Sequence, residues 1–326
     1  MAKRKLIAIA FSDIHLHYWT KFNKGGSRTK HQLSLLSKLF KICMDNKVPG
    51  LFPGDLFHDP FSVSNVLLDM VSKEFAKLNQ KNINSKYKVK IYAISGNHDQ
   101  SSSSFIDDYP PNYVRSFSRL TNWLECVDYK SVETENFSVH GLPYITGNVG
   151  ILKKANEFEH HFIKPNILMI HSDYAGAKDT SGRVVDSSEN IDDNITKGFD
   201  LVLSGHIHLY QKLSKDKELY MVGATHQQSR NDKNCKGMGF LKVYSDMSIE
   251  RVSLKSPIFI DVNNEADIKD DYNYYTLVKV NNETKNVNIK KIKNKKLRDK
   301  KIIKMYCKDK GVDSERKSLL IKTLSK

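Results

Sequence analysis

The stretch Leu6–His15, LIAIAFSDIH, decides how the rest of the chain is interpreted. Its first six residues are all apolar, which predicts a strand buried on both faces, as in a parallel sheet. Asp13 and His15 follow directly at the carboxyl end of that strand. In open α/β sheets, ligands bind beyond the carboxyl ends of the strands. The stretch therefore predicts an α/β core with a polar site at its edge.

The residues that follow repeat the alternation of strand and helix. Apolar residues at helical spacing predict helices at His31–Asn46 and Val63–Leu78. Short apolar runs predict strands at Gly50–Phe52, Val89–Ile94, Ser138–Leu142, Ile167–Ile170 and Leu201–Ser204. This order is typical of a largely parallel α/β sheet. After His208 no helix separates the short apolar runs, which predicts antiparallel pairing there.

Polar residues follow five of these predicted strands. Imidazole and carboxylate donors without thiolate suit Mn²⁺, Fe²⁺ or Zn²⁺. Seven donors exceed what one ion needs, and a shared carboxylate can bridge two ions about 3.5–4 Å apart, as in sites that hydrolyse phosphoesters. Glycines at 54, 96 and 205 would permit the tight turns. The candidate metal ligands are Asp13, His15, Asp55, Asn97, His171, His206 and His208.

Each of these signals alone also has a structural explanation. An Asp after a strand commonly caps a turn or a helix. A lone His is more often a packed core residue than a ligand. The histidines that follow no predicted strand keep this structural interpretation: His31, His140, His160, His161 and His226.

Five motifs together resemble those of the calcineurin-like metallophosphoesterase superfamily in order and spacing. They are DIH at 13–15, GD at 54–55, GNHD at 96–99, the lone His171, and GHIH at 205–208. The resemblance runs from about Lys5 to Leu254. It implies an α/β fold, a four-layer αββα sandwich with a small C-terminal α+β or helical appendage.

The resemblance also implies a role for each motif residue. Two divalent ions, expected to be Mn²⁺, would share Asp55 as a bridge. His98 would face the phosphate and protonate the leaving oxygen, and Asp99 would orient His98. The other ligands would divide into Asp13, His15 and His208 for one ion, and Asn97, His171 and His206 for the other.

The segment GDLFHDP, residues 54–60, is similar to the second motif of SbcD-type DNA nucleases, which carries a His three residues after the bridging Asp. It implies that His58 acts on the nucleic acid; alternatively, His58 caps the helix that begins near Ser62. The implied function is a Mn²⁺-dependent DNA exo- and endonuclease subunit for recombination or repair, working with an SbcC-type coiled-coil ATPase. The alternatives are a small-substrate phosphodiesterase, a phosphoprotein phosphatase, or a non-enzymatic scaffold on the same fold.

The basic charge of the chain is concentrated at its C-terminus. Between Lys285 and Lys326 there are 16 Lys and Arg and four Asp and Glu, within a net charge of +15 for the whole chain. Such a block binds a polyanion or an acidic protein face, or stays solvated. We expect a nuclease domain at 1–254 and a capping and partner-docking region at 255–326. The segments 297–307 and 313–324 are candidate docking helices.

The loop after the first motif combines aromatic and basic residues beside the predicted site. Such a loop suits base stacking and phosphate neutralisation, although an ordinary surface loop can have the same composition. The candidate DNA contacts are His17, Trp19, Lys21, Lys24 and Arg28.

The remaining features concern the setting of the protein. No apolar run approaches the roughly 18 residues of a membrane span. The four cysteines are dispersed, which predicts no disulfide framework and no cysteine zinc site. We expect a cytoplasmic protein, of a size that suits a phage gene. The two predicted helices at 31–46 and 63–78 are candidates for a homodimer interface.

Overall fold

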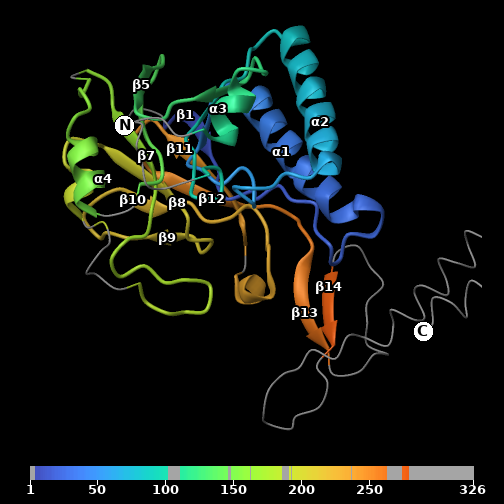
Figure 1. Ribbon diagram of the computed structural model, residues 1–326. Coiled ribbons are helices and arrows are strands. Elements are labelled where there is room, and N and C mark those ends of the chain that lie inside the picture. Colours follow the sequence, from blue (N-terminus) through green and yellow to red (C-terminus); the bar gives the residue numbers. More distant parts are fainter. Residues whose placement is uncertain are drawn as a thin grey trace, which may run out of the picture. The chain divides into compact units, whose positions relative to one another are not determined.

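The computed structural model describes residues 4–101, 111–145, 148–161, 163–185, 191, 193–235, 237–262 and 274–278. The chain forms two compact units, one of Met1–Ile260 with Asp271–Tyr275 and one of Asp261–Asp270 with Thr276–Lys326. The first unit contains both large sheets (Figure 1). The candidate docking helices at 297–307 and 313–324 lie outside the described residues, and the division after residue 254 stays a prediction.

The first sheet is built around the strand of the opening stretch. Its order is β12-β11-β1-β2-β3-β4, in which β1 to β4 pair in parallel and β11 pairs antiparallel with both β1 and β12. The strands are β1 (Leu6–Ala10), β2 (Gly50–Phe52), β3 (Ile91–Ala93), β4 (Leu124–Cys126), β11 (Gly239–Tyr244) and β12 (Ile249–Ser253).

The second sheet has the order β5-β6-β7-β8-β10-β9, with parallel pairing from β6 to β10. The antiparallel pairing predicted after His208 is confirmed for β9–β10 and β11–β12. It is wrong for β10, which also pairs in parallel with β8. The strands are β5 (Lys130–Glu133), β6 (Ser138–Leu142), β7 (Asn166–His171), β8 (Leu201–Gly205), β9 (Gln211–Lys212) and β10 (Leu219–Met221); β13 (Ile258–Val262) and β14 (Tyr274–Val278) form a separate two-stranded sheet.

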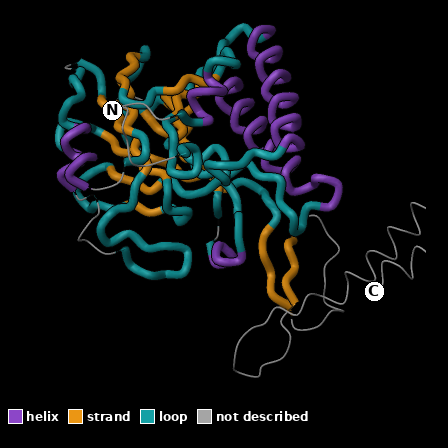
Figure 2. Tube along the Cα trace, in the orientation of Figure 1, coloured by secondary structure: helices purple, strands orange, loops and turns teal. Residues whose placement is uncertain are grey.

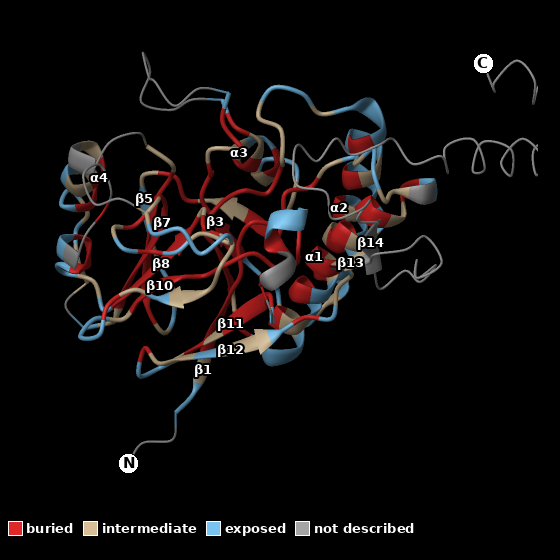
Figure 3. Ribbon diagram, turned by 90° about the horizontal axis from the view of Figure 1, so that it is seen from below, coloured by how far each residue is buried: buried red, intermediate tan, exposed pale blue. Residues whose placement is uncertain are grey.

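Helices cover the outer face of each sheet. α1 (Ser27–Asn46), α2 (Asn65–Asn84) and α3 (Tyr113–Ser118) pack on the first sheet, and α4 (Asn148–Ala155) with the 3₁₀ turn Asp193–Thr196 packs on the second. Figure 2 shows α1 and α2 on one side of the strands and α4 on the opposite side. Between the sheets lies a third apolar cluster, and Figure 3 shows buried residues gathered along these strands. This is the four-layer αββα arrangement that the sequence predicted.

Both long helices extend beyond their predicted bounds. α1 begins four residues before His31, because the Asn23 side chain accepts hydrogen bonds from the backbone N–H groups of Arg28 and Thr29 (2.9 and 3.1 Å). α2 continues to Asn84 instead of Leu78. None of the helices in the described ranges is both long and apolar enough to cross a lipid bilayer.

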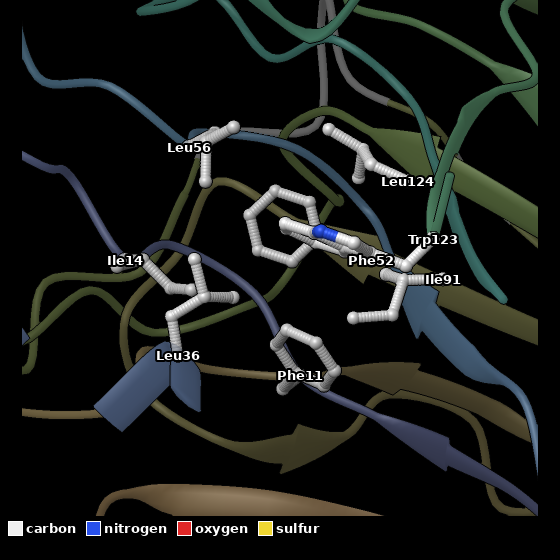
Figure 4. Close-up of a pocket in the computed structure, with 8 residues that line it drawn as sticks. All are labelled: Phe11, Ile14, Leu36, Phe52, Leu56, Ile91, Trp123 and Leu124. Atoms are coloured by element: carbon white, nitrogen blue, oxygen red, sulfur yellow. The ribbon is translucent and has the colours of Figure 1, made fainter. Parts of the chain in front are cut away.

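A small apolar cavity lies in the helix-side core of the first sheet, and Figure 4 shows its lining. Its volume is about 10 Å³, room for no more than one water molecule. The Trp123 Nε1 atom is buried there and has no hydrogen-bond partner among the described residues. The cavity is too small and too apolar to bind a phosphate, so the functional site lies elsewhere. The residues that line the cavity are Phe11, Ile14, Leu36, Phe52, Leu56, Ile91, Trp123 and Leu124.

Candidate metal centre

The loops after β1 and β2 run side by side beyond the ends of their strands. The backbone N–H of Asp13 donates to the Gly54 carbonyl (3.1 Å), and that of His15 donates to the Asp55 carbonyl (3.0 Å). Leu16 continues the pairing one residue further, with a parallel bridge to Phe57. The first two motifs are therefore held together by backbone hydrogen bonds before any side chain is considered.

The backbone is strained where it presents the candidate ligands. Asp13, His15, Asp55 and His206 have φ angles of 53°, 48°, 59° and 90°. They are four of the eight non-glycine residues with positive φ in the described part of the chain. Such conformations cost about 1–3 kcal/mol each and cluster at functional sites. The strain is thus concentrated on predicted ligands.

The three motif glycines are required by close approaches. A Cβ atom at Gly96 would lie 2.1 Å from Asp55 Oδ1, and one at Gly205 would lie 2.1 Å from the Pro53 carbonyl oxygen. At Gly54 it would lie 2.4 Å from His171 Nδ1, and φ there is +95°. The expectation that these glycines allow tight turns is confirmed.

One set of donor atoms forms around His15. Its Nε2 lies 3.3 Å from His208 Nε2, 3.3 Å from Asp55 Oδ2 and 3.8 Å from Asp13 Oδ1. Two donors bound to one ion at about 2.1 Å lie roughly 3 Å apart. The spacing of these atoms therefore fits a shared cation, and Asp13, His15 and His208 form one compact cluster.

A second set forms around His171. Its Nε2 lies 3.3 Å from Asp55 Oδ2 and 3.1 Å from Asn97 Oδ1, which in turn lies 3.0 Å from His206 Nδ1. Asp55 Oδ2 is thus equally far from an imidazole nitrogen of each set, the position that a bridging carboxylate needs. The fold brings together all seven residues that the sequence proposed as ligands.

The charge at the centre also fits divalent cations. Asp13 and Asp55 are buried, and in the described part of the chain neither pairs with a lysine or arginine. Asp13 Oδ2 has no hydrogen-bond partner among the residues that the structure describes, and burial raises the pKa of Asp13. Although burial alone would raise the pKa of Asp55, the imidazoles of His171 and His15 hold it well below its ordinary value. Buried carboxylates of this kind need cationic partners, which two divalent ions would supply.

Acceptors outside the cluster set the orientation of three candidate imidazole ligands. His171 Nδ1 donates to the Pro53 carbonyl (2.7 Å), so Nε2 faces the site. His208 Nδ1 lies 3.3 Å from Asp232, and His206 Nε2 lies 3.3 Å from Asp173. Such partners fix the tautomer and raise the basicity of the other nitrogen.

Neither of these two carboxylates was predicted from the sequence. Asp173 lies two residues after His171, a spacing that a search beyond the first ligands would have found. Asp232 lies in the 3₁₀ turn Arg230–Asn234, where it also completes a capping box with Ser229. No signal in the sequence connects that turn with His208.

His98 is oriented by a backbone carbonyl and not by Asp99. His98 Nδ1 lies 2.5 Å from the His58 carbonyl oxygen, which leaves Nε2 free for proton transfer. The Asp99 carboxylate accepts hydrogen bonds from the backbone N–H groups of Leu56, Phe57 and Gly96 (3.2, 2.9 and 3.0 Å). These donors occupy the carboxylate inside the turn. The predicted pairing of Asp99 with His98 is therefore corrected: Asp99 ties the second motif to the third.

His58 belongs to a ring cluster beside the metal ligands, which we call the histidine wall: His17, Trp19, His58 and His98. The His58 ring stacks on His98 (5.3 Å between centroids, 15° between planes) and lies 5.0 Å from His17 and 4.7 Å from Trp19. His58 does not cap α2, because Ser64 accepts the bond from the Leu67 N–H. The alternative role as a helix cap is therefore wrong.

The protonation of His58 follows from its neighbours. Burial and the nearby imidazoles lower its pKa to about 4, so it is neutral near pH 7. Its Nδ1 lies 3.4 Å from His15 Nδ1. With His15 Nε2 bound to an ion, His15 Nδ1 would carry the proton and donate it to His58 Nδ1. The His58 Nε2–H would then remain as a donor.

His15, His58 and His98 are also close enough together to form a metal site. This set contains no carboxylate to balance the charge of an ion. His15 already directs Nε2 toward Asp55 and His208, and His98 Nδ1 is engaged by a carbonyl. The set is therefore a weaker candidate than the two that share Asp55.

The candidate DNA contacts after the first motif fall into different environments. Lys21 is exposed and His17 is half-buried, whereas the Lys24 side chain lies outside the described part. Trp19 donates from Nε1 to Gln32 (3.0 Å). Arg28 is only 4% exposed, and its guanidinium lies 3.8 Å over the Trp19 ring. This burial argues against the predicted contact of Arg28 with phosphate, which requires access from solvent.

Comparison with known proteins agrees with the motifs. A model of the family described as calcineurin-like phosphoesterase matches residues 8–210, more than half of the chain. No curated protein matches the sequence. One similar solved structure is a Pseudomonas putida nuclease MPE, at 16% identity and a TM-score of 0.25, covering 49% of this chain and 59% of that one. At that TM-score the likeness carries no weight for fold or substrate. By its family match and its motifs, the chain belongs to the calcineurin-like phosphoesterases, a family of metal-dependent phosphoester hydrolases.

Proposed function

We propose that this phosphoesterase is a Mn²⁺-dependent DNA nuclease with exo- and endonuclease activity. The observation that carries the proposal is the histidine wall beside the candidate metal ligands, in which His58 stacks on His98 and is neutral near pH 7. A small phosphodiester needs only the metal ligands and a proton donor. A wall of rings beside them is useful for a substrate that continues past the scissile phosphate.

The chemistry divides between the ligands and the wall. Two divalent ions, when bound, would polarise the phosphate oxygens and lower the pKa of a coordinated water. His98 is placed to give a proton from Nε2 to the leaving oxygen, because its Nδ1 is engaged by the His58 carbonyl. His58 is placed to donate from Nε2 to a non-bridging phosphate oxygen.

The surroundings of the wall support a nucleic-acid strand. His17 is half-buried at its edge, and Lys21 and Lys30 are exposed nearby in the sequence. Aromatic rings stack on bases, and lysines neutralise the phosphates that follow. We therefore keep His17 and Lys21 as proposed DNA contacts.

The wider role is also part of the proposal. The basic C-terminal region, residues 255–326, would dock on an SbcC-type coiled-coil ATPase, and the pair would act in DNA recombination or repair in the cytoplasm. α1 and α2 would form the interface of a homodimer. The ATPase partner and the role in recombination or repair rest on the resemblance of the second motif and on the charge of the region, and the homodimer rests on the apolar faces of the two helices.

The test is to incubate the purified protein in Mn²⁺ with linear DNA and, separately, with bis(p-nitrophenyl) phosphate. We expect both substrates to be hydrolysed, and Asp55→Asn to abolish both reactions. Hydrolysis of the small diester without cleavage of DNA, with or without the ATPase, would favour a small-substrate phosphodiesterase. Activity on a phosphoprotein alone would favour a phosphatase. Absence of both metal binding and hydrolysis would favour a scaffold.

A further inference from the structure

We propose that Arg28 is a positioning residue that fixes the histidine wall relative to the metal ligands. Arg28 is 4% exposed and lies in the first turn of α1, beneath the loop of the first motif. Its guanidinium contacts structural supports of both parts of the site. The inference rests on the proposed function, because its main consequence is for a substrate that uses the wall.

On one side, the Arg28 guanidinium contacts the segment that supports the candidate metal ligands. Arg28 donates from Nη2 to the Gln228 carbonyl oxygen. The Gln228 side chain donates from Nε2 to the Asp13 carbonyl (2.6 Å), and its backbone N–H donates to Asp232 (2.9 Å). Asp232 in turn faces His208 at 3.3 Å. Arg28 therefore packs against the segment that supports Asp13 and His208, while Gln228 and Asp232 reach those two residues through contacts that do not involve Arg28.

On the other side, the Arg28 guanidinium contacts the histidine wall. The guanidinium lies 3.8 Å over the Trp19 ring, a geometry with cation–π stabilisation. Trp19 lies 4.7 Å from the His58 ring and is held from its far edge by Gln32. Gln32 also donates to the His15 carbonyl (2.7 Å). Trp19 thus acts as a spacer between Arg28 and His58.

A third contact joins the start of β13 to the same cation. The Phe259 ring lies 5.6 Å from the guanidinium, and the Phe259 N–H donates to the Gln227 side chain (2.7 Å). Gln227 and Gln228 are adjacent, so the segment that supports Asp13 is also held by β13. Arg28 is the point where the first-motif loop, the 227–232 segment and β13 meet.

These roles require arginine in particular. The guanidinium is planar, stacks on an aromatic ring and donates in fixed directions, whereas a lysine ammonium offers a point charge without a stacking face. A buried cation in an arrangement of this kind is costly to desolvate. The position is therefore better explained by geometry than by a gain in stability.

The consequence concerns selectivity between substrates. If Arg28 is removed, Trp19 and His58 lose their fixed distance from Asp13 and His208. A displacement of about 1 Å can reduce a rate by about a hundredfold when the displaced group contacts the substrate. A small diester that uses the metal ligands and His98 is expected to be far less sensitive than DNA.

The experiment compares Arg28→Met and Arg28→Lys with Arg251→Met at saturating Mn²⁺. Arg251 is a matched control, since it also lies over an aromatic ring (Tyr210, 4.5 Å) and donates to a backbone carbonyl (Gly237, 2.8 Å). For Arg28→Met we expect DNA cleavage to fall by about tenfold or more, with hydrolysis of bis(p-nitrophenyl) phosphate within about twofold of wild type. Arg28→Lys should cleave DNA at a rate between those of wild type and Arg28→Met, and Arg251→Met should change neither activity.

Tryptophan emission gives a readout independent of activity. The chain has two tryptophans, so the difference between wild type and Trp19→Phe isolates the Trp19 signal. Arg28→Met should shift that signal, and Arg251→Met should not. An unchanged signal, or an equal loss of both activities, would overturn the inference; if Arg28→Met does not fold, Arg28→Lys is held to the same criteria. Wild-type protein that cuts no DNA would refute the proposed function instead, and the Trp19 signal would still decide the role of Arg28.

Discussion

The two halves of the metal centre use the same ligand chemistry but are held in different ways. His208 faces Asp232, which is buried and accepts backbone hydrogen bonds from Gln228 and Ser229 (2.9 and 2.8 Å). His206 faces Asp173, whose side chain is 42% exposed. Although burial would lower the pKa of His208, Asp232 raises it above its ordinary value, whereas burial lowers the pKa of His206.

This difference shows where the site is rigid and where it is open. The His208 half is continuous with the histidine wall through His15 and is supported from the interior by Gln32, Gln228 and Arg28. The His206 half has the ring of Tyr144 (5.9 Å) as its neighbour, and its orienting carboxylate reaches solvent. We expect substitutions in the first half to have the larger effects.

Asp55→Asn removes the group that the halves share, and it should have the largest effect. A side chain that bridges two cations needs the negative charge of a carboxylate, which the neutral amide of Asn does not offer. We expect hydrolysis of both substrates to fall by roughly a thousandfold or more. Circular dichroism should show the wild-type fold, and the exposed substitution Asp246→Asn should keep wild-type rates. Equal activity in Asp55→Asn would mean that the two halves work without a bridge.

His58→Ala tests whether the wall belongs functionally to the first half. We expect DNA cleavage to fall by about a hundredfold, because a donor to the phosphate and its stacking partner are lost together. Hydrolysis of bis(p-nitrophenyl) phosphate should change by about twofold at most. Rates for the two substrates in the same Mn²⁺ buffer provide the comparison. A parallel loss of both activities would place His58 among the metal ligands.

Asp232→Asn weakens the orientation of His208 while preserving shape. Loss of such a partner reduces metal affinity by about 10–100-fold. Titration of the metal-free protein with Mn²⁺ in a calorimeter should show one of the two sites weakened by that amount. If both sites weaken equally, the halves are coupled more strongly than their separate supports suggest.

Asp173→Asn should have the smallest effect of this series. Because the carboxylate is partly solvated, its interaction with His206 is screened, and water can replace it. We expect the affinity of the second site to fall by less than about tenfold. An effect larger than that of Asp232→Asn would reverse the proposed order of the two halves.

The seven candidate ligands could be found from the sequence because their positions depend on local rules. Asp55 and His206 follow apolar strands, His171 is the last residue of one, and parallel strands end at one edge. The same rules predicted β1 and β2 from their continuous runs of apolar residues. They did not give β4, whose apolar run is interrupted by Glu125, or α3, whose six residues are too few for a periodic signal.

The errors concern contacts between segments that are distant in sequence. Arg28 was assigned to DNA from the composition of its loop, which contains no information about burial. Asp99 was paired with its neighbour His98, yet its carboxylate turns toward backbone donors more than 40 residues away at Leu56 and Phe57. Asp232 reaches His208 only because a 3₁₀ turn presents it. Tertiary packing decides all three.

The most direct test of the account is the location of bound Mn²⁺ by anomalous diffraction from crystals grown with the ion. We predict two peaks about 3.5–4 Å apart on either side of Asp55 Oδ2, one beside His15 and His208 and the other beside His171 and His206. A single peak, or a peak among His15, His58 and His98, would contradict the two-ion centre bridged by Asp55.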